Sequence, residues 1–269
     1  MANGSNDSGQ ILRDIDVMIP HSARIWNYWL GGKDNFRADR EAGDEFLELY
    51  PAQLDKARAC RRFLARAVQY LAVDEGVRQF LDIGTGLPTA NNTHEVAQRM
   101  APESRVVYVD NDPLVLAHAR ALLTSSPEGV TSYIDADLHD PEKILAAAAE
   151  TLDFTRPIAM LLIGVLGHVE DYDEARSIVR RLLDGLPSGS FLVQCDGTDT
   201  SAEYLAAIAR YRDSGGVPYN VRTQEQIAGF YEGLELIEPG VVPIPQWRAE
   251  TLLGEPRDVD ESGGVGRKR

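Results

Sequence analysis

A glycine-containing turn is the first segment of the sequence with the residue types of a ligand site. It reads DIGTGLPT from Asp82 to Thr89 and directly follows the apolar run at residues 80–83. Glycine allows backbone conformations with positive φ and lets a bound molecule approach the main chain closely. Taken alone, the turn is equally consistent with a nucleotide site and with a tight structural turn after a strand.

Two later carboxylates follow apolar runs of their own. Asp110 comes after residues 105–109, and an acid of the segment Asp135-Ala136-Asp137-Leu138 comes after residues 132–134. In a parallel sheet the carboxyl ends of the strands meet at one edge, where ligands bind. Asp110 is placed to accept hydrogen bonds from both ribose hydroxyls, while the later segment offers an acid that could accept one from an adenine amine and a backbone amide that could donate one to the ring. The pattern therefore predicts an adenosine site.

The glycine turn favours S-adenosylmethionine (SAM) over a nicotinamide dinucleotide. A pyrophosphate is bound by the spacing GxGxxG and by free amides at a helix N-terminus. Here Thr89 occupies the third glycine position, and Pro88 has no amide to donate. Asp82 would repel phosphate but attract a cation. Asn92 and Glu95 have the spacing of a capping box, which starts the next helix late. The sequence also lacks a Tyr-x-x-x-Lys pair for hydride transfer.

Several short motifs, in order, resemble those of the class I SAM-dependent methyltransferases from residue 79 to about residue 245. The first three read FLDIGTG, VVYVDNDP and IDADLHDP, and a later block reads MLLIGVLGHVED and LPSGSFLVQCDG. Over nearly the whole chain, SARIWNYWLGGKDNFRADR and DIGTGLPTANNTHEVAQ resemble an actinobacterial S-adenosyl methyltransferase family that was formerly a domain of unknown function. The resemblance implies an α/β fold with a Rossmann-like, seven-stranded sheet and SAM as the cofactor. It implies no particular methyl acceptor.

The resemblance also implies how the methionine part of SAM is bound. Gly84 and Gly86 would approach this part closely, and Asp82 would act indirectly on its amino group. Ile163 and Gly164 lie where the end of the fourth strand touches the methionyl segment in this class.

For the adenosine part, the resemblance assigns the ribose hydroxyls to Asp110 and the adenine to Asp137 and Leu138. Asn111 is a further candidate, although Asn-Asp-Pro is also an ordinary turn and helix start. The chain departs from the general pattern at Pro88, where the last glycine of the first motif is expected, so the local path of this loop stays open.

One histidine is the candidate general base. A base is optional in methyl transfer, because the sulfonium already activates the carbon and most of the rate can come from alignment and desolvation. His168 follows the apolar run at residues 158–163, at the mouth of the expected crevice, and could take a proton from a hydroxyl acceptor. An equally weighted alternative is that His168 caps or packs the following helix.

Residues 20–76 are predicted to form a helical extension, with helices ending at residue 30 and spanning residues 38–49 and 52–72. In the first of these helices the spacing of Trp29 and Trp26 predicts burial against the domain. Arg24 and Tyr28 lie four residues apart on another line of the helix. These two are the expected lid contacts to the cofactor or the acceptor.

Between residues 77 and 254, short apolar runs alternate with helical patterns, which predicts a mostly parallel sheet covered on both faces. The expected strands are 80–83, 105–109, 132–134, 158–163 and 190–195, and the expected helices are 92–100, 113–124, 141–151, 172–186, 200–213 and 224–232. Residues 234–238 and 241–244 flank Pro239-Gly240 and predict an antiparallel hairpin. Residues 1–19 and 255–269 have the composition of flexible tails, where no chemistry is expected.

The formal net charge of −15 disfavours binding to nucleic acids or anionic membranes. The basic stretch from Lys56 to Arg66 has the pattern of a solvated helix face. Cys60 and Cys195 are predicted to be buried thiols, and no metal site is expected. Neither a membrane span nor a signal peptide is recognisable, which predicts a cytoplasmic protein.

Together these features predict a SAM-dependent methyltransferase that acts on an oxygen or nitrogen nucleophile of a small molecule. A SAM-binding regulatory or sensor protein without transferase activity is the alternative, and only turnover separates the two. An NAD-dependent oxidoreductase is disfavoured by Pro88 and Thr89. The acceptor and the oligomeric state are not indicated by the sequence.

Overall fold

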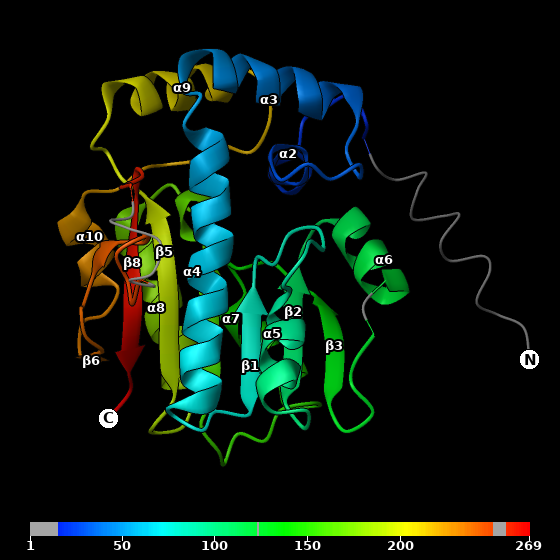
Figure 1. The fold of residues 1–269 in the computed structure, drawn as a ribbon, viewed down its shortest axis with the longest axis vertical. Coiled ribbons are helices and arrows are strands. Elements are labelled where there is room, and N and C mark those ends of the chain that lie inside the picture. The colour runs from blue at the N-terminus through cyan, green and yellow to red at the C-terminus, as the bar shows by residue number, and fades with distance from the viewer. Residues whose placement is uncertain (1–15, 123, 250–256) are drawn as a thin grey trace, which may run out of the picture.

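The structure is a computed structural model that describes residues 16–122, 124–249 and 257–269. Its centre is a single sheet in the order β3-β2-β1-β4-β5-β8-β6, with β7 also paired to β8 (Figure 1). The parallel strands are β1 Gln79–Ile83, β2 Arg105–Asp110, β3 Val130–Asp135, β4 Ala159–Ile163 and β5 Phe191–Gly197. Strand β8, Glu261–Arg267, is antiparallel to β5. The strand order reverses between β1 and β4, which is where open α/β sheets bind their ligands.

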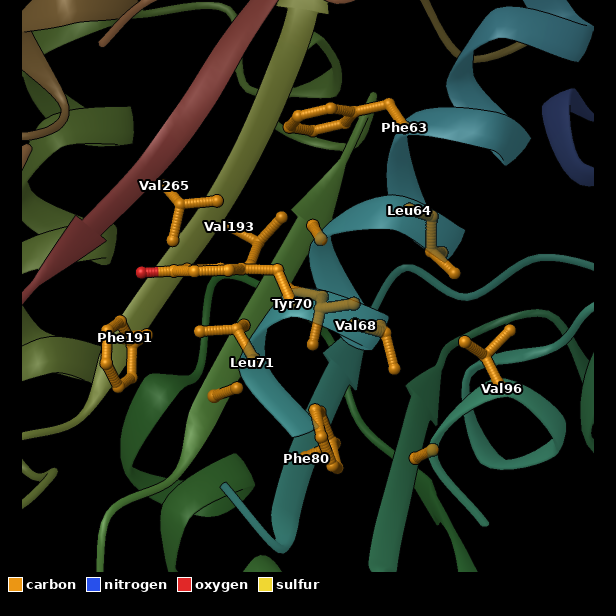
Figure 2. Packing of buried hydrophobic residues seen from close by; sticks show 14 of the residues in the cluster. Phe63, Leu64, Val68, Tyr70, Leu71, Phe80, Val96, Phe191, Val193 and Val265 are labelled. Atoms are coloured by element: carbon orange, nitrogen blue, oxygen red, sulfur yellow. The ribbon is translucent and has the colours of Figure 1, made fainter. Parts of the chain in front are cut away.

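Alternate residues of the central strands enter two separate cores, as the pleat of a strand requires. Phe80 and Val106 pack with α4 on one face, while Leu81 and Val107 pack with α7 and α8 on the other. Figure 2 shows the first core, in which Leu71 of α4 lies near Phe80 and Val193. The helices that cover the sheet are α4 Gln53–Val73, α5 Thr93–Met100, α6 Pro113–Leu122, α7 Pro141–Ala148 and α8 Tyr172–Asp184. Two cores on one sheet hold its carboxyl edge rigidly.

A third layer lies over the carboxyl ends of the parallel strands (Figure 1). It consists of α2 Ser22–Trp29, α3 Arg37–Leu49 and α9 Ala202–Arg212. A further short helix outside this layer, α10, spans Gln224–Gly229. Rings of Trp29, Phe46 and Tyr204 pack in this layer, with a Trp29–Phe46 centroid distance of 5.1 Å. Because α9 comes from the sheet domain, the N-terminal helices are held over the sheet edge by an apolar core.

The α/β class, the first five predicted strands with their parallel order, and the predicted helices are confirmed, with shifts at the ends of several elements. The capping box of Asn92 and Glu95 is present, and Asn92 precedes the first residue of α5. Both cysteines are free and buried, as predicted. The His21 side chain caps the first helix by accepting from the Ala23 amide. No helix in the described ranges is long and apolar enough to cross a bilayer.

The C-terminal part of the sheet corrects two predictions. In residues 16–122, 124–249 and 257–269 the sheet has eight strands rather than seven, and β6 Glu235–Leu236 and β7 Val242–Pro243 each pair with β8 instead of with each other. Strand β8 lies within residues 255–269, for which a flexible tail was predicted. A Cβ atom on Gly263 would lie 2.3 Å from the Gln194 carbonyl oxygen, so only glycine fits there. The described part of the predicted N-terminal tail begins at residue 16.

Candidate functional site

A cavity of about 360 Å³ lies at the carboxyl ends of β1, β2 and β4, beneath α2. It is the space at the reversal of the strand order. Ten of the twelve residues that the sequence predicted for the site line this cavity: Asp82, Gly84, Gly86, Asp110, Asn111, Asp137, Leu138, Ile163, Gly164 and His168. The topology therefore brings together residues that are up to 86 positions apart in the chain.

The glycine turn after β1 has a conformation that requires glycine. Gly84 and Gly86 have φ angles of 71° and 66°, which side chains rarely adopt. A Cβ atom on Gly84 would also lie 2.3 Å from the Val165 side chain. The Gly86 amide donates a 2.9 Å hydrogen bond to Asp110. The turn thus exposes main chain to the cavity and fixes the carboxylate at the end of β2.

Asp110 is nearly buried and lies at the centre of this edge, with 8% of its surface exposed. Its Oδ2 atom accepts from the Gly86 amide, and its Oδ1 atom accepts from the Asp112 amide at 2.9 Å. Burial raises the pKa of Asp110, while these two hydrogen bonds lower it. Each carboxylate oxygen keeps a lone pair, so the side chain can accept one hydrogen bond from each of two neighbouring hydroxyls.

Asp137 and Leu138 lie at the rim of the cavity, after β3. Burial raises the pKa of Asp137, but hydrogen bonds from the His139 amide and ring outweigh this effect and hold the pKa below its usual value. The Asn111 amide also donates to Asp137, at 3.3 Å. Asp137 is therefore a charged hydrogen-bond acceptor beside the ribose-type site at Asp110.

A carboxylate and a guanidinium meet at the other end of the cavity. Asp82 accepts a 2.6 Å hydrogen bond from the Thr93 hydroxyl, and desolvation raises its pKa to about 6. Arg61 of α4 also lines this end, and burial lowers its pKa although Asp82 opposes that effect. Arg61 Nη2 donates to the Asn91 carbonyl, but its buried Nε has no partner among the described residues. One acidic and one basic group suit the zwitterionic end of an amino acid.

His168 ends a short 3-10 helix, Leu166–His168, that follows β4. Its Nδ1 lies 3.0 Å from the Pro218 carbonyl oxygen. Only a protonated Nδ1 can form this hydrogen bond, so the neutral ring carries its free lone pair on Nε2. Desolvation lowers the pKa of His168 below 6.5, which keeps the ring neutral at neutral pH. The tautomer and the protonation state are those of a general base.

Neither of the two predicted lid residues lines the cavity. Arg24 is buried away from the cavity, where it pairs with Asp39 at 3.2 Å. Tyr28 donates a 2.6 Å hydrogen bond to Asp44 of α3. The α2 residues that line the cavity include Trp26 and Asn27. The apolar stripe of α2 packs on α3 and α9. This packing fixes the orientation of α2 about its axis, so that Trp26, rather than Arg24 and Tyr28, faces the cavity.

The basic stretch of α4 is not uniformly solvated, which corrects another prediction. Arg58 and Arg62 are exposed, but Lys56 is fully buried and lies 2.7 Å from Glu261 of β8. Burial opposes the charged ammonium, yet Glu261 outweighs this effect and raises the pKa of Lys56. The buried residues of α4 recur every three or four positions, and Gln53, Lys56 and Cys60 belong to this series, so the periodicity could have singled out Lys56 in the sequence. Nothing in the composition of residues 255–269 indicated Glu261.

Glu261 also lies close to the two cysteines. One ligand-type atom from each of Cys60, Cys195 and Glu261 falls within 4.8 Å of the others. The cation beside this carboxylate is the Lys56 ammonium, at 2.7 Å. The group is therefore an ion pair with two adjacent thiols, in which the lysine supplies the positive charge.

The sequence matches the family described as S-adenosyl methyltransferase over residues 8–269. A solved DUF574 family protein from Streptomyces avermitilis MA-4680 is 47% identical, with a TM-score of 0.90, over 94% of this chain and 99% of that one. A Thermobifida fusca YX protein, provisionally described as a methyltransferase, is 39% identical, with a TM-score of 0.85, over 94% of this chain and 97% of that one. No curated protein matches the sequence. The chain therefore belongs to the S-adenosyl methyltransferase family and is an enzyme with SAM as its cofactor.

Proposed function

We propose that the enzyme transfers the methyl group of SAM to an oxygen or nitrogen nucleophile of a small molecule. The observation that carries this proposal is the cavity beneath α2, which combines nucleoside-binding and amino acid-binding groups with a neutral histidine. Such a roofed site excludes water and suits a small acceptor. The net charge of −15 argues against a nucleic-acid substrate.

The side chains of the cavity fit SAM along its length. Asp110 would accept from the two ribose hydroxyls, and Asp137 and the Leu138 amide would bind the adenine edge. Gly84 and Gly86 would pass close to the methionyl segment, with Gly164 opposite. When bound, SAM supplies an activated methyl group on a positively charged sulfur. Asp82 favours this charge, whereas it would repel the phosphates of a dinucleotide.

Arg61 is the proposed partner of the SAM carboxylate. Its unpartnered Nε is a buried donor, and burial strengthens an ion pair with a ligand carboxylate. We expect Arg61→Gln to weaken S-adenosylhomocysteine binding by about 2 kcal/mol, roughly thirtyfold. Binding of 5′-methylthioadenosine, which lacks the amino acid end, should change little. Calorimetric titration of both ligands measures the difference, and an equal loss for the two would contradict the assignment.

The chain's part in the transfer is to align the acceptor and accept its proton. For a hydroxyl acceptor, the oxygen forms the new bond to carbon while the carbon–sulfur bond breaks, and the electron pair remains on sulfur. His168 Nε2 would take the hydroxyl proton, since Nδ1 is held by the Pro218 carbonyl. Alignment and desolvation supply the rest of the rate.

Replacement of His168 tests this role once an acceptor is in hand. We expect His168→Ala to lower kcat by about a hundredfold with saturating SAM, because general bases typically contribute that much. The cofactor Kd should stay the same. In the wild type, kcat should be constant near neutral pH and fall only below pH 6.5, where the ring becomes protonated, since burial lowers its pKa. If the variant has the kcat of the wild type, and its kcat falls at acidic pH in the same way, His168 is not the general base.

A further inference from the structure

A second cavity, here called the aromatic chamber, adjoins the SAM cavity beneath α2. Its volume is about 40 Å³, and its walls include Trp26, Gln53, Lys56, Tyr204 and Tyr219. Trp26 and His168 line both cavities. A molecule lying across this shared wall would have one end in the chamber and would still reach the proposed base.

Lys56 brings a buried donor to the chamber. Its ammonium lies 2.7 Å from Glu261 Oε2 and donates to the Tyr204 hydroxyl at 2.8 Å. Only 2% of the side chain is exposed. An ammonium carries three N–H donors, and among the described residues these are the two hydrogen-bonding partners of Lys56 in the chamber. One donor thus remains for a ligand, and a cationic ligand group would be repelled.

Gln53 brings a buried acceptor to the same chamber. Its Oε1 atom has no hydrogen-bond partner in the part of the chain that the structure describes, and the residue is 2% exposed. Gln53 precedes Lys56 by three positions on α4, so both side chains lie on one face of the helix. A hydroxyl group can accept from an ammonium and donate to an amide oxygen at the same time. A buried acceptor left unpaired is costly, and a ligand hydroxyl would remove this cost.

The chamber walls favour a flat apolar body attached to this hydroxyl. The Lys56 ammonium lies 4.6 Å from the ring centroid of Tyr204 and 5.8 Å from those of Trp26 and Tyr219. Rings in such a setting pack against another ring by edge or offset contacts. We propose that the methyl acceptor is a hydroxylated aromatic molecule and that a phenolic hydroxyl binds between Lys56 and Gln53. This proposal rests on the adjoining cavity holding SAM.

Matched fluorinated ligands test the recognition without requiring turnover. With the wild type saturated by S-adenosylhomocysteine, fluorine NMR titrations compare para-fluorophenol, para-fluorotoluene and para-fluoroaniline. We expect the phenol to bind at least about tenfold more tightly than the other two. The toluene can neither donate nor accept a hydrogen bond, and the aniline nitrogen is a poor acceptor for an ammonium. Equal binding of toluene or aniline would overturn the proposal.

Three variants locate the site. Gln53→Met keeps the side-chain length but removes the amide oxygen, and should reduce the preference for phenol over toluene, because only the hydrogen bond from Lys56 remains. Ile208→Phe fills the chamber from α9, where Ile208 is 8% exposed, and should abolish phenol binding. Leu205→Phe, at a 39% exposed position of the same helix, is the matched control and should change nothing.

Calorimetry with S-adenosylhomocysteine on the same samples separates the two levels of the argument. If the wild type does not bind S-adenosylhomocysteine, the proposed function is overturned. Intact binding of this ligand, with phenol affinity unaffected by both Gln53→Met and Ile208→Phe, would overturn only the phenolic acceptor. If Ile208→Phe does not fold, the Gln53→Met result decides alone.

Discussion

Replacement of Asp110 by alanine is expected to weaken SAM and S-adenosylhomocysteine binding by about 3 kcal/mol, roughly a hundredfold or more. The variant would lose the proposed hydrogen bonds from two ribose hydroxyls to a charged acceptor. It also loses the acceptor for the Gly86 amide, at 2.9 Å, which holds the glycine turn. Both effects act on the same ligand, so no other single side chain of the cavity should matter as much. Calorimetric titration measures the loss.

Asp135 provides the matched control for this prediction. It pairs in register with Asp110 on the neighbouring strand β3, but it is exposed and does not line the cavity. Asp135→Ala should therefore leave the ligand Kd unchanged. A folded Asp110→Ala variant with the affinity of the Asp135→Ala variant would refute the ribose assignment.

The second large effect is expected on stability, from Lys56→Met. Lys56 and Glu261 form an ion pair at 2.7 Å, with side-chain exposures of 2% and 0%. Removing the lysine leaves a buried carboxylate without its cation, which typically costs about 3–5 kcal/mol. Urea denaturation should show this loss in the free energy of unfolding. Glu261 lies on β8, so we expect the pairing of β5 with β8 to weaken first.

Two companion variants identify the cause. Arg58→Met changes an exposed residue of α4, two positions along the helix, and should stay within about 0.5 kcal/mol of the wild type. The double variant Lys56→Met/Glu261→Gln removes both charges and should recover much of the loss, because replacing a whole buried pair is far less costly than breaking it. If Lys56→Met is as stable as Arg58→Met, the ion pair does not stabilise the fold.

The sequence sufficed for the cavity residues at the carboxyl edge of the sheet, because local signals coincide there with topology. Each acidic residue or glycine follows a run of apolar residues, and parallel strands bring all such positions to one edge. Asp82, Gly86, Asp110 and Asp137 could therefore be placed without knowledge of side-chain packing. The capping box at Asn92 was equally local, since its partner Glu95 is three residues away.

The remaining site residues depend on packing between distant segments. Whether Arg24 or Trp26 faces the cavity is decided by how α2 is rotated against α3 and α9. The spacing of Trp29 marks the apolar face of the helix but does not show which side of it lies toward the cavity. From the sequence alone, Lys56 is predicted to be a solvent-exposed lysine, because its partner cannot be recognised. That partner, Glu261, lies 205 positions later in a glycine-rich segment. Strand β8 uses Gly263 because the main chain of β5 leaves no room for a side chain. Such a composition looks like that of a tail.

The most direct test of the central claim is a calorimetric titration of the purified protein with S-adenosylhomocysteine, followed by NAD. We predict one S-adenosylhomocysteine bound per chain with micromolar affinity and no binding of NAD, because Pro88 and Asp82 leave no cradle for a pyrophosphate. Binding of NAD at least as tight as that of S-adenosylhomocysteine, or binding of neither ligand, would contradict the assignment of this cavity to SAM.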